Sequence, residues 1–422
     1  MPALLVSQSP PLYGEVRLHG AKNSVLPILA ATLLCRTPCM LHGCPDLLDV
    51  DHALAMLRAL GCEALRTGTS IYIDASRAVG GHIAPQLAAS MRASSLFLGA
   101  LLARTGEACL TLPGGCPIGK RPLDYHLRAF RALGAQTQLT QECVHCKARA
   151  LHGAKIVLPA PSVGATQNAL LAALGAQGDT TIENAAREPE IVDLACFLRA
   201  CGARIRGDGT KTLFISGGRA LHGARYRIMP DRMEAATYLC ACAACGGELT
   251  LRGAQPQQVL TVLDALRQSG CAIKSAQSTL RIQREGELRV CAPVTARPYP
   301  GFATDAMPLL LAAQLTAHGS TSFTETIFEN RFLYVPQLQK LGAALRMQGQ
   351  TVWLDAPSPL RGTTLEAHDL RGGAALVLAA LCAEGESTIF GVKHLDRGYD
   401  KLARTLQSVG ARLKTVEIPI KV

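Results

Sequence analysis

A cysteine in a loop rich in Gly and Pro is the residue of this sequence best suited to chemistry. Cys116 lies in LPGGCPIGKRPLDYH, residues 112–126, which follows an expected strand and precedes an expected amphipathic helix. Lys120 and Arg121 come shortly after it. Adjacent cations favour the thiolate over the thiol, whose reference pKa is about 8.5. Such a loop can also close over a site. The segment therefore predicts a reactive thiol, with an incidental loop cysteine as the alternative.

Asp305 is the second candidate, as a general base. It lies in ATDAMP, residues 303–308, between apolar neighbours at the start of an expected helix. A carboxylate in a closed cleft can take the proton of a substrate hydroxyl within hydrogen-bond reach. The alternative is an N-cap of that helix, since Asp is a preferred capping residue. Arg331 and Arg397 each follow an expected strand and open the next helix, where anion ligands belong.

Charged and polar residues also gather where six Ala- and Leu-rich segments begin. Helix N-termini expose free N–H groups and carry partial positive charge, so they attract anions. The residues at these starts are Lys22 and Asn23, Arg92, Ser162 to Gly164, Asp231 and Arg232, Thr304 and Asp305, and Asp369 to Arg371. Helix capping is the alternative for the Ser, Thr, Asp and Asn among them. Lys22 and Arg92 are not capping residues, which favours a ligand role for both.

The composition limits the kinds of ligand that this chain is expected to bind. The chain has 422 residues, 48% hydrophobic and 4% aromatic, with a formal net charge of +11. The length predicts two or three domains, and the charge favours anionic partners. Proteins that bind nucleic acid by stacking on bases need aromatic residues among the basic ones. Aromatic residues are scarce here, so we expect phosphorylated small molecules as ligands and no nucleic acid.

The sixteen cysteines bear on the compartment and on metal binding. No signal peptide and no apolar run long enough to span a bilayer accompany them, so we expect a cytoplasmic protein with no membrane partner and mostly free thiols. Cys143 and Cys146 come closest to a metal motif. No second Cys or His pair stands at zinc-finger spacing from them. We therefore expect strand residues there, with no metal and no cofactor.

One signature recurs six times: an amphipathic helix, a turn with Gly, and a short alternating strand. The turn glycines are Gly61, Gly134, Gly202, Gly270, Gly342 and Gly410, at intervals of 73, 68, 68, 72 and 68 residues. Gly suits a helix C-terminus because the closing residue prefers positive φ. Each unit has an earlier helix that is apolar nearly all round, which indicates burial. The predicted unit is strand–helix–strand–helix–strand–strand.

Units of about 70 residues are longer than the common solenoid repeats, whose periods run roughly 20 to 50 residues. The six units predict an α/β protein of two domains, each with three units, helices inside and sheets outside. The midpoint lies near residues 228–231, where the fourth unit begins.

Over residues 14–410 the chain resembles the UDP-N-acetylglucosamine 1-carboxyvinyltransferases. The segments that carry the resemblance are GAKNSVLPILAATLL, MRASSLFLGALLAR, LPGGCPIGKRPLDYH, PSVGATQN, IENAAREPEIVDLA, MPDRMEAATYL, FATDAMP, TETIFENRF, DLRGGAALVLAAL and HLDRGYDKL. The Cys loop and the GAKN, NAAREPE and ENRF segments are the specific ones.

The resemblance implies two inside-out α/β barrels of three repeats each, in agreement with the six units. One domain would comprise residues 22–229, with the Cys loop, and the other residues 1–21 and 230–422, with the active site in the cleft between them. The implied reaction transfers the enolpyruvyl group of phosphoenolpyruvate to the 3′-hydroxyl of UDP-N-acetylglucosamine and releases phosphate. It is the first committed step of peptidoglycan synthesis, and so serves cell shape and division.

The resemblance also implies roles for single residues. Cys116 matches the general acid for C3 of phosphoenolpyruvate, which can form a covalent adduct and is the target of fosfomycin. Asp305 matches the group that takes the sugar hydroxyl proton. Lys22, Arg121 and Arg397 match the ligands of the phosphate and carboxylate. The residues that match sugar-nucleotide contacts or lie near the reacting centre are Asn23, Arg92, Arg121, Pro122, Leu123, Asp124, Tyr125, Ser162, Val163, Gly164, Ile327, Arg331, Asp369 and Arg371.

The sequence departs from the family pattern at one position, and two other functions remain as alternatives. Ala160 stands where the family often has Lys, two residues before Ser162, which bears on the nucleotide contacts. The first rival function is the sister enolpyruvyl transferase for shikimate 3-phosphate, which lacks the Cys-bearing segment. The second is an RNA-end-processing or RNA-binding protein on a related fold, for which the net charge of +11 is the main support.

Overall fold

The computed structural model describes residues 1–80, 83–112, 118–119 and 122–419. The described chain forms two compact units. The first unit contains residues 1–19, 118–119 and 230–419, and the second contains residues 20–80, 83–112 and 122–229.

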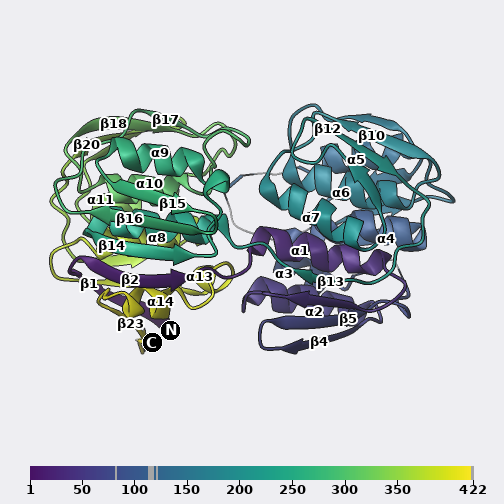
Figure 1. Ribbon diagram of the computed structural model, residues 1–422, viewed down its shortest axis with the longest axis horizontal. Coiled ribbons are helices and arrows are strands. Elements are labelled where there is room, and N and C mark those ends of the chain that lie inside the picture. Colours follow the sequence, from purple (N-terminus) through teal and green to yellow (C-terminus); the bar gives the residue numbers. More distant parts are fainter. Residues whose placement is uncertain (81–82, 113–117, 120–121, 420–422) are drawn as a thin grey trace. The chain divides into compact units, whose positions relative to one another are not determined.

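The second unit has three sheets outside a group of apolar helices (Figure 1). The sheets are β13-β3-β5-β4 (Arg225–Arg227, Cys39–His42, Ser70–Asp74, Glu63–Thr67), β6-β8-β7 (Glu107–Thr111, Cys143–Lys147, Gln136–Leu139) and β11-β12-β10-β9 (Arg204–Arg206, Thr212–Ser216, Asp179–Glu183, Lys155–Val157). The apolar helices are α1 (Lys22–Ala31), α4 (Phe97–Thr105) and α6 (Val163–Leu174), and the second helices of the repeats are α2 (Leu48–Ala59), α5 (Asp124–Ala132) and α7 (Pro189–Ala200). Shorter pieces are the 3-10 helices η1 (Thr32–Leu34) and η2 (Arg92–Leu96), and α3 (Pro85–Ser90). α4 packs against both α1 and α6 in the interior.

The first unit repeats this plan. Its sheets are β21-β22-β1-β23 (Thr364–Glu366, Glu386–Phe390, Pro2–Ser7, Leu413–Glu417), β15-β16-β14-β2 (Ala272–Ala276, Thr279–Arg284, Gly247–Arg252, Leu12–Arg17) and β17-β18-β20-β19 (Val294–Thr295, Gly319–Thr324, Thr351–Ala356, Leu345–Gln348). Its apolar helices are α8 (Arg232–Cys245), α10 (Met307–Gln314) and α12 (Leu370–Ala380). The remaining helices are α9 (Leu260–Gln268), α11 (Val335–Lys340), α13 (Lys393–Asp396), α14 (Leu402–Ser408) and the 3-10 helix η3 (Pro256–Gln258). α10 packs against α8 and α12, which forms the centre of this unit.

The predicted repeat is confirmed. β9, α6, β10, α7, β11 and β12 follow one another as strand–helix–strand–helix–strand–strand, with β9 parallel to β10 and β11 antiparallel to β12. The repeat that begins at β17 has the same order and pairing. The fold is therefore the predicted pair of α/β barrels with helices inside and sheets outside.

Some sheets take a strand from a distant part of the chain. β2 runs parallel to β14 from Leu12↔Gly247 to Arg17↔Arg252, and β1 lies between β22 and β23. Among the described residues the sheet β6-β8-β7 has three strands, one fewer than the predicted unit. The segment before η2 carries Gly80 and Pro85, which are poor strand residues, and Pro85 opens the helix α3 instead.

The six turn glycines all have the backbone conformation that the sequence predicts. Their φ angles lie between 87° and 102°. At Gly61 the N–H donates to the carbonyl of Arg58, and the next N–H, of Cys62, donates to Leu57. This is the Schellman closure of a helix C-terminus, and it recurs at all six turns. Each amphipathic helix is therefore ended by the same local device.

The apolar helices are buried as predicted. In α6, every residue from Ala165 to Leu174 is buried, and the same holds for α10 along its whole length. Within the described residues, no helix is both long and apolar enough to cross a bilayer. Cys143 and Cys146 lie on strand β8, as expected.

Candidate active site

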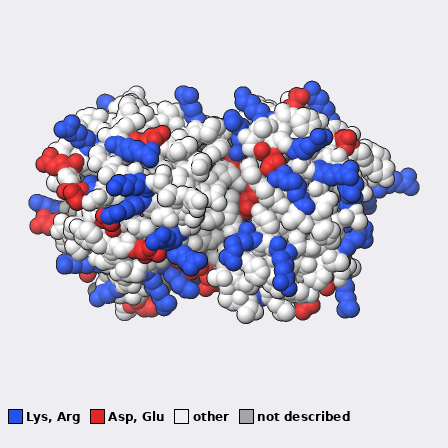
Figure 2. Space-filling model, in the orientation of Figure 1, with Lys and Arg blue, Asp and Glu red and all other residues white. Residues whose placement is uncertain are grey.

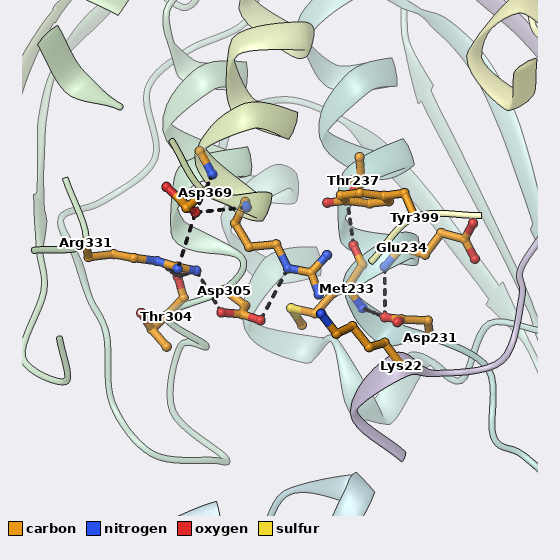
Figure 3. A network of polar contacts seen from close by, with 12 residues as sticks. Lys22, Asp231, Met233, Glu234, Thr237, Thr304, Asp305, Arg331, Asp369 and Tyr399 are labelled. Carbon is orange, nitrogen blue, oxygen red and sulfur yellow. Dashed lines mark hydrogen bonds and ion pairs between the residues drawn. The ribbon is translucent and has the colours of Figure 1, made fainter. Parts of the chain in front are cut away.

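Asp305 lies between two buried arginines in the first unit. Its Oδ1 is 2.7 Å from Nη2 of Arg331, and its Oδ2 is 3.3 Å from Nε of Arg371. Both arginine side chains are 2% exposed, whereas the Asp305 side chain is 30% exposed. Figure 3 shows the carboxylate facing Arg331. The arginines thus fix the orientation of the carboxylate, which still has an exposed face for a ligand.

Asp305 does not cap its helix. α10 begins at Met307, and the capping position is Ala306, which makes no side-chain cap. The capping alternative for Asp305 is therefore wrong, because the helix starts one residue too late for its side chain to serve as the cap. That side chain engages the two arginines instead.

Arg331 links three parts of the first unit. Its Nε and Nη2 donate to the carbonyl oxygen of Thr304 at 3.2 and 3.1 Å, and its Nη1 lies 3.9 Å from Oδ1 of Asp369. The side chain precedes α11 and joins the start of α10 to the start of α12. A planar guanidinium with several donors suits this position better than a single ammonium group.

Asp369 is the N-cap of α12. Its Oδ1 accepts from the N–H groups of Arg371 and Gly372, both at 3.0 Å. Asp231 caps α8 in the same way, and its Oδ1 accepts from Met233 at 2.7 Å and Glu234 at 3.1 Å. Capping, the alternative for both residues, is confirmed. A ligand role for Asp369 stays a prediction.

The guanidinium of Arg371 is held charged. Burial alone would lower the pKa of Arg371, but Tyr399, Asp305 and Asp231 raise it, and the net shift is upward. Its Cζ also lies 5.1 Å from the centre of the Tyr399 ring, within cation–π range. Arg371 therefore brings a fixed positive charge next to Asp305.

Glu325 is a buried residue of this site that the sequence analysis missed. Its Oε2 accepts from the Thr304 hydroxyl at 2.5 Å, and its Oε1 accepts from the N–H groups of Ile327 at 2.6 Å and Phe328 at 3.3 Å. Glu325 thus ties the segment before Asp305 to the segment that carries Ile327. The signal available in the sequence was an acidic residue directly after a strand, in FTETIF.

Part of the Cys loop belongs to the first unit. Asn330 N donates to the carbonyl of Ile118 at 2.9 Å, and a Cβ on Gly119 would lie 2.4 Å from Oε2 of Glu329. Two predicted residues of this loop, Cys116 and Arg121, lie outside the described residues.

Arg397 does not open a helix as the sequence predicted. It closes the short helix α13, and α14 begins five residues later, at Leu402. Gly398 and Lys401, the latter with a φ of 58°, separate the two helices. Arg397 stays partly exposed in the first unit.

In the second unit, Lys22 opens α1 and lies 2.6 Å from Oδ2 of Asp49 through its Nζ. Asp49 is buried in the first turn of α2 and the Lys22 side chain is 12% exposed, while Asn23 is exposed. Lys22 does not cap its helix, because the capping position is Ala21. A largely buried ammonium group stands at this helix start.

Asp193, also missed by the sequence analysis, fixes the start of α1. Its Oδ2 accepts from the Ser24 hydroxyl and from Met229 N at 3.3 Å, and its Oδ1 accepts from the Tyr226 hydroxyl at 2.6 Å. Burial raises the pKa of Asp193, and the hydrogen bonds from Ser24 and Tyr226 oppose that rise. This carboxyl group ties α7 to the helix that carries Lys22.

Arg92 and the start of α6 lie around a buried histidine. Burial, followed by the charge of Arg92, lowers the pKa of His126 to about 4, so the ring is neutral. His126 Nδ1 accepts from Nδ2 of Asn168 at 2.8 Å, and a Cβ on Gly164 would lie 3.1 Å from its Cε1. Ser162 caps α6 by accepting from Ala165 N at 3.4 Å.

The other predicted residues of this unit lie at the start of α5, except Val163, which lies at the start of α6. Leu123 occupies the capping position and is buried, and Asp124 is the first helical residue. Pro122 is exposed, and Tyr125 packs partly against the core. Val163 opens α6 and also packs against the core.

Comparison with known proteins gives one consistent picture. The chain matches the family described as EPSP synthase (3-phosphoshikimate 1-carboxyvinyltransferase) over residues 6–406. It is 43% identical to "UDP-N-acetylglucosamine 1-carboxyvinyltransferase 2" of Caldanaerobacter subterraneus subsp. tengcongensis, over 95% of this chain and 96% of that protein. It is also 43% identical to the UDP-N-acetylglucosamine 1-carboxyvinyltransferase of Finegoldia magna, over 99% of this chain and 100% of that protein.

Solved structures agree. The chain is similar to the enolpyruvyl transferase NikO from Streptomyces tendae, with a TM-score of 0.88 and 27% identity over 99% of both chains. EPSP synthase from Acinetobacter baumannii has the same fold, with a TM-score of 0.73 and 20% identity over 99% of this chain and 100% of that chain.

Proposed function

We propose an activity for this chain, which belongs to the UDP-N-acetylglucosamine 1-carboxyvinyltransferase family and is a transferase. It transfers the enolpyruvyl group of phosphoenolpyruvate to the 3′-hydroxyl of UDP-N-acetylglucosamine and releases phosphate. The observation that carries the proposal is the carboxylate of Asp305, held by Arg331 and Arg371 with one face exposed instead of capping its helix.

In the addition step, Asp305 takes the proton of the 3′-hydroxyl, and the oxygen forms a bond to C2 of phosphoenolpyruvate. Cys116 gives a proton to C3, which becomes a methyl group. In the elimination step, the Cys116 thiolate takes a proton back from C3, the C2–O bond to phosphate breaks and the double bond returns, while the departing phosphate takes the proton held by Asp305. A positioned base and acid of this kind typically contribute about 10²- to 10⁴-fold each.

Fixed cations hold the two anionic reactants in this proposal. Lys22, Arg121 and Arg397 bind the phosphate and carboxylate of phosphoenolpyruvate. Charges set in place before the reaction stabilise a charged intermediate without reorganising. The buried ammonium of Lys22, ion-paired with Asp49, supports this role because its position is already fixed.

The remaining predicted residues bind the sugar nucleotide in this proposal. Support comes from the start of α6, where the helix N-terminus and the neighbouring charge of Arg92 favour a diphosphate. The proposed contacts are Asn23, Arg92, Arg121, Pro122, Leu123, Asp124, Tyr125, Ser162, Val163, Gly164, Ile327, Arg331, Asp369 and Arg371.

Of the rival functions, transfer to shikimate 3-phosphate is the less favoured. The named relatives at 43% identity are UDP-N-acetylglucosamine enzymes, whereas the EPSP synthase structure at 20% identity shares the fold. RNA binding has less support. On the face of the first unit that Figure 2 shows, Lys and Arg side chains are interspersed with Asp and Glu and form no continuous basic stripe.

The wider setting follows from the proposed reaction. The product is a precursor of peptidoglycan, and Cys116 is the site at which fosfomycin would form its covalent bond. We place the enzyme in the cytoplasm. The fifteen cysteines in the described part of the chain form no disulfide, as expected in a reducing compartment.

Phosphate release tests the proposal with phosphoenolpyruvate and each acceptor in turn. We expect turnover with UDP-N-acetylglucosamine and none with shikimate 3-phosphate. Asp305→Ala should lose about 10²-fold or more of kcat. The control Asp264→Ala, an exposed residue paired with Arg267, should keep it. Turnover only with shikimate 3-phosphate, or full activity in Asp305→Ala, contradicts the proposal.

A further inference from the structure

Three cysteines that are distant in sequence meet in the core of the second unit. The sulfur atoms of Cys35, Cys39 and Cys201 all lie within 4.8 Å of one another. Each residue is at most 1% exposed, and all three belong to the continuous apolar core of this unit. In the described part of the chain, no fourth Cys, His, Asp or Glu joins the group. None of the three has a part in the proposed reaction.

The fold brings these thiols together through three separate elements. Cys35 closes η1, Cys39 opens β3 and Cys201 closes α7. The residues between the first two, 36–38, are exposed, so the cluster lies one layer below the surface.

Backbone contacts hold this surface turn in place. Arg36 N donates to Leu221 O at 2.9 Å, and Gly223 N donates to the Thr37 hydroxyl at 2.8 Å. A Cβ on Gly223 would lie 1.8 Å from the carbonyl oxygen of Pro38, so this close approach needs Gly. The cluster is therefore fixed by its scaffold and lies directly beneath the exposed turn of residues 36–38.

The spacing suits three bonds to one central atom. Sulfur ligands about 2.3 Å from a shared centre lie roughly 4 Å apart around a flat trigonal ion, and roughly 3.5 Å apart around a pyramidal ion with a lone pair. The observed upper limit of 4.8 Å is wider than either value, so the side chains must rotate to bring the three sulfurs closer together around one ion. Soft thiolate ligands select soft ions. Three sulfurs favour an ion that forms a stable complex with only three ligands.

The net charge of the complex with three thiolates then distinguishes between the candidate ions. Three thiolates around a zinc ion carry a net charge of −1, and around a monovalent copper ion a net charge of −2. A buried charge without a partner is costly. Zinc also prefers a fourth ligand. A trivalent ion with three thiolates is neutral, needs no fourth ligand and matches an apolar pocket.

We propose that Cys35, Cys39 and Cys201 form a binding site for a trivalent thiophilic metalloid, the class to which arsenic(III) and antimony(III) belong. With arsenous acid, three S–H bonds and three As–OH bonds break, three As–S bonds form and three waters leave. Arsenic stays trivalent, so the step needs no oxidant or reductant. The bound ion joins η1, which directly follows α1, and the start of β3 to the C-terminal end of α7.

The test uses the full chain, reduced with a phosphine, mixed with arsenite and freed of excess by gel filtration. We expect one tightly held arsenic per chain. X-ray absorption should find three sulfur neighbours around it. Cys35→Ala, Cys39→Ala and Cys201→Ala should each lower retention at least tenfold, because an arsenic held by two thiols keeps an exchangeable oxygen ligand. Alanine is used since it leaves no unpaired polar group in the core.

Two control variants locate the site. Cys62→Ala removes another buried thiol of the same unit and should leave retention unchanged. Cys245→Ala breaks a pair whose sulfurs lie 3.9 Å apart in the first unit, and it too should have no effect on the tightly held ion. Loss of retention in Cys245→Ala, or a wild-type spectrum with two sulfurs and one oxygen, overturns the proposal. The wild-type spectrum decides even if a cluster variant fails to fold.

Discussion

One guanidinium, that of Arg331, holds both the side chain of Asp305 and the backbone just before it. Nη2 lies 2.7 Å from Oδ1 of Asp305, and the same group donates to the carbonyl of Thr304 at 3.2 and 3.1 Å. The Asp305 carboxylate therefore cannot rotate freely about its own backbone. Its direction is set before any ligand arrives.

Replacing Arg331 with Lys should separate charge from geometry. Lys keeps the positive charge, but its single ammonium cannot span Thr304, Asp305 and Asp369 together, which three separate nitrogens of the guanidinium reach. We expect kcat to fall about 10- to 100-fold, since small misplacements of a catalytic group carry costs of that order. Urea unfolding should show a loss of about 1–3 kcal/mol. Arg267→Lys, at an exposed pair with Asp264, should change neither, and wild-type turnover in Arg331→Lys would argue against the positioning role.

Glu325 should act through position and not through chemistry. Glu325→Leu removes the carboxylate that accepts from the N–H groups of Ile327 and Phe328, and each of these part-buried hydrogen bonds should contribute about 0.5–1.5 kcal/mol to the unfolding free energy. We expect kcat to fall and KM to rise together. Glu325→Gln should recover most of both, because its amide oxygen can still accept. Steady-state kinetics decide, and equal defects in the two variants would point to a chemical role for the charge.

Gly372 makes room for Asp369. A Cβ there would lie 2.5 Å from Oδ2 of Asp369 and 2.9 Å from Cβ of Tyr334, so Gly372→Ala should push the cap away from Arg331. Overpacking of this kind costs typically about 1–3 kcal/mol. Thermal unfolding should show the loss. In Gly286→Ala, where an added Cβ meets nothing within 4 Å, the melting temperature should stay at the wild-type value.

His126 should make stability fall in mild acid. Burial and Arg92 lower the pKa of His126 to about 4, below its ordinary value of 6.5. Between pH 6.5 and pH 4, His126 is therefore protonated in the unfolded chain and neutral in the folded chain. The stability is fully present above pH 6.5 and is lost as the pH falls towards 4, by up to about 3 kcal/mol.

The matched variant for this effect is His126→Gln, whose amide oxygen can accept from Asn168 but does not titrate. Its unfolding free energy should depend less steeply on pH between about 6.5 and 4 than that of the wild type. Parallel slopes for the two proteins in urea titrations would show that the histidine does not carry the acid sensitivity.

The repeat could be predicted from the sequence because each amphipathic helix ends at a glycine whose conformation other residues rarely adopt. The same local rule could not decide the role of Asp305. An Asp near a helix start fits a cap or a ligand equally well, and the difference depends on whether α10 begins at residue 306 or 307. The contacts of Asp305 with Arg331 and Arg371 become visible only in the folded structure.

Contacts between residues far apart in the chain could not be predicted from the sequence for a different reason. Glu325 looks like a surface residue after a strand, and its burial becomes visible only when Thr304 stands opposite. Cys35, Cys39 and Cys201 lie in three elements, the last more than a hundred residues from the others, and nothing in their local spacing predicts a cluster. Arg397 was misplaced because α13, a helix of four residues, interrupts the repeat.

The position of β1 has a consequence for synthesis on the ribosome. Of the described strands β1 is translated earliest, yet its two neighbours, β22 and β23, begin at residues 386 and 413. At about 5–20 residues per second, the nascent strand waits roughly 20 to 80 seconds for its partners. Residues 20–229, by contrast, contain every strand of their own sheets and can mature during translation. β1 therefore lacks its partner strands until β22 and β23 emerge, and a holding chaperone would protect it during that interval.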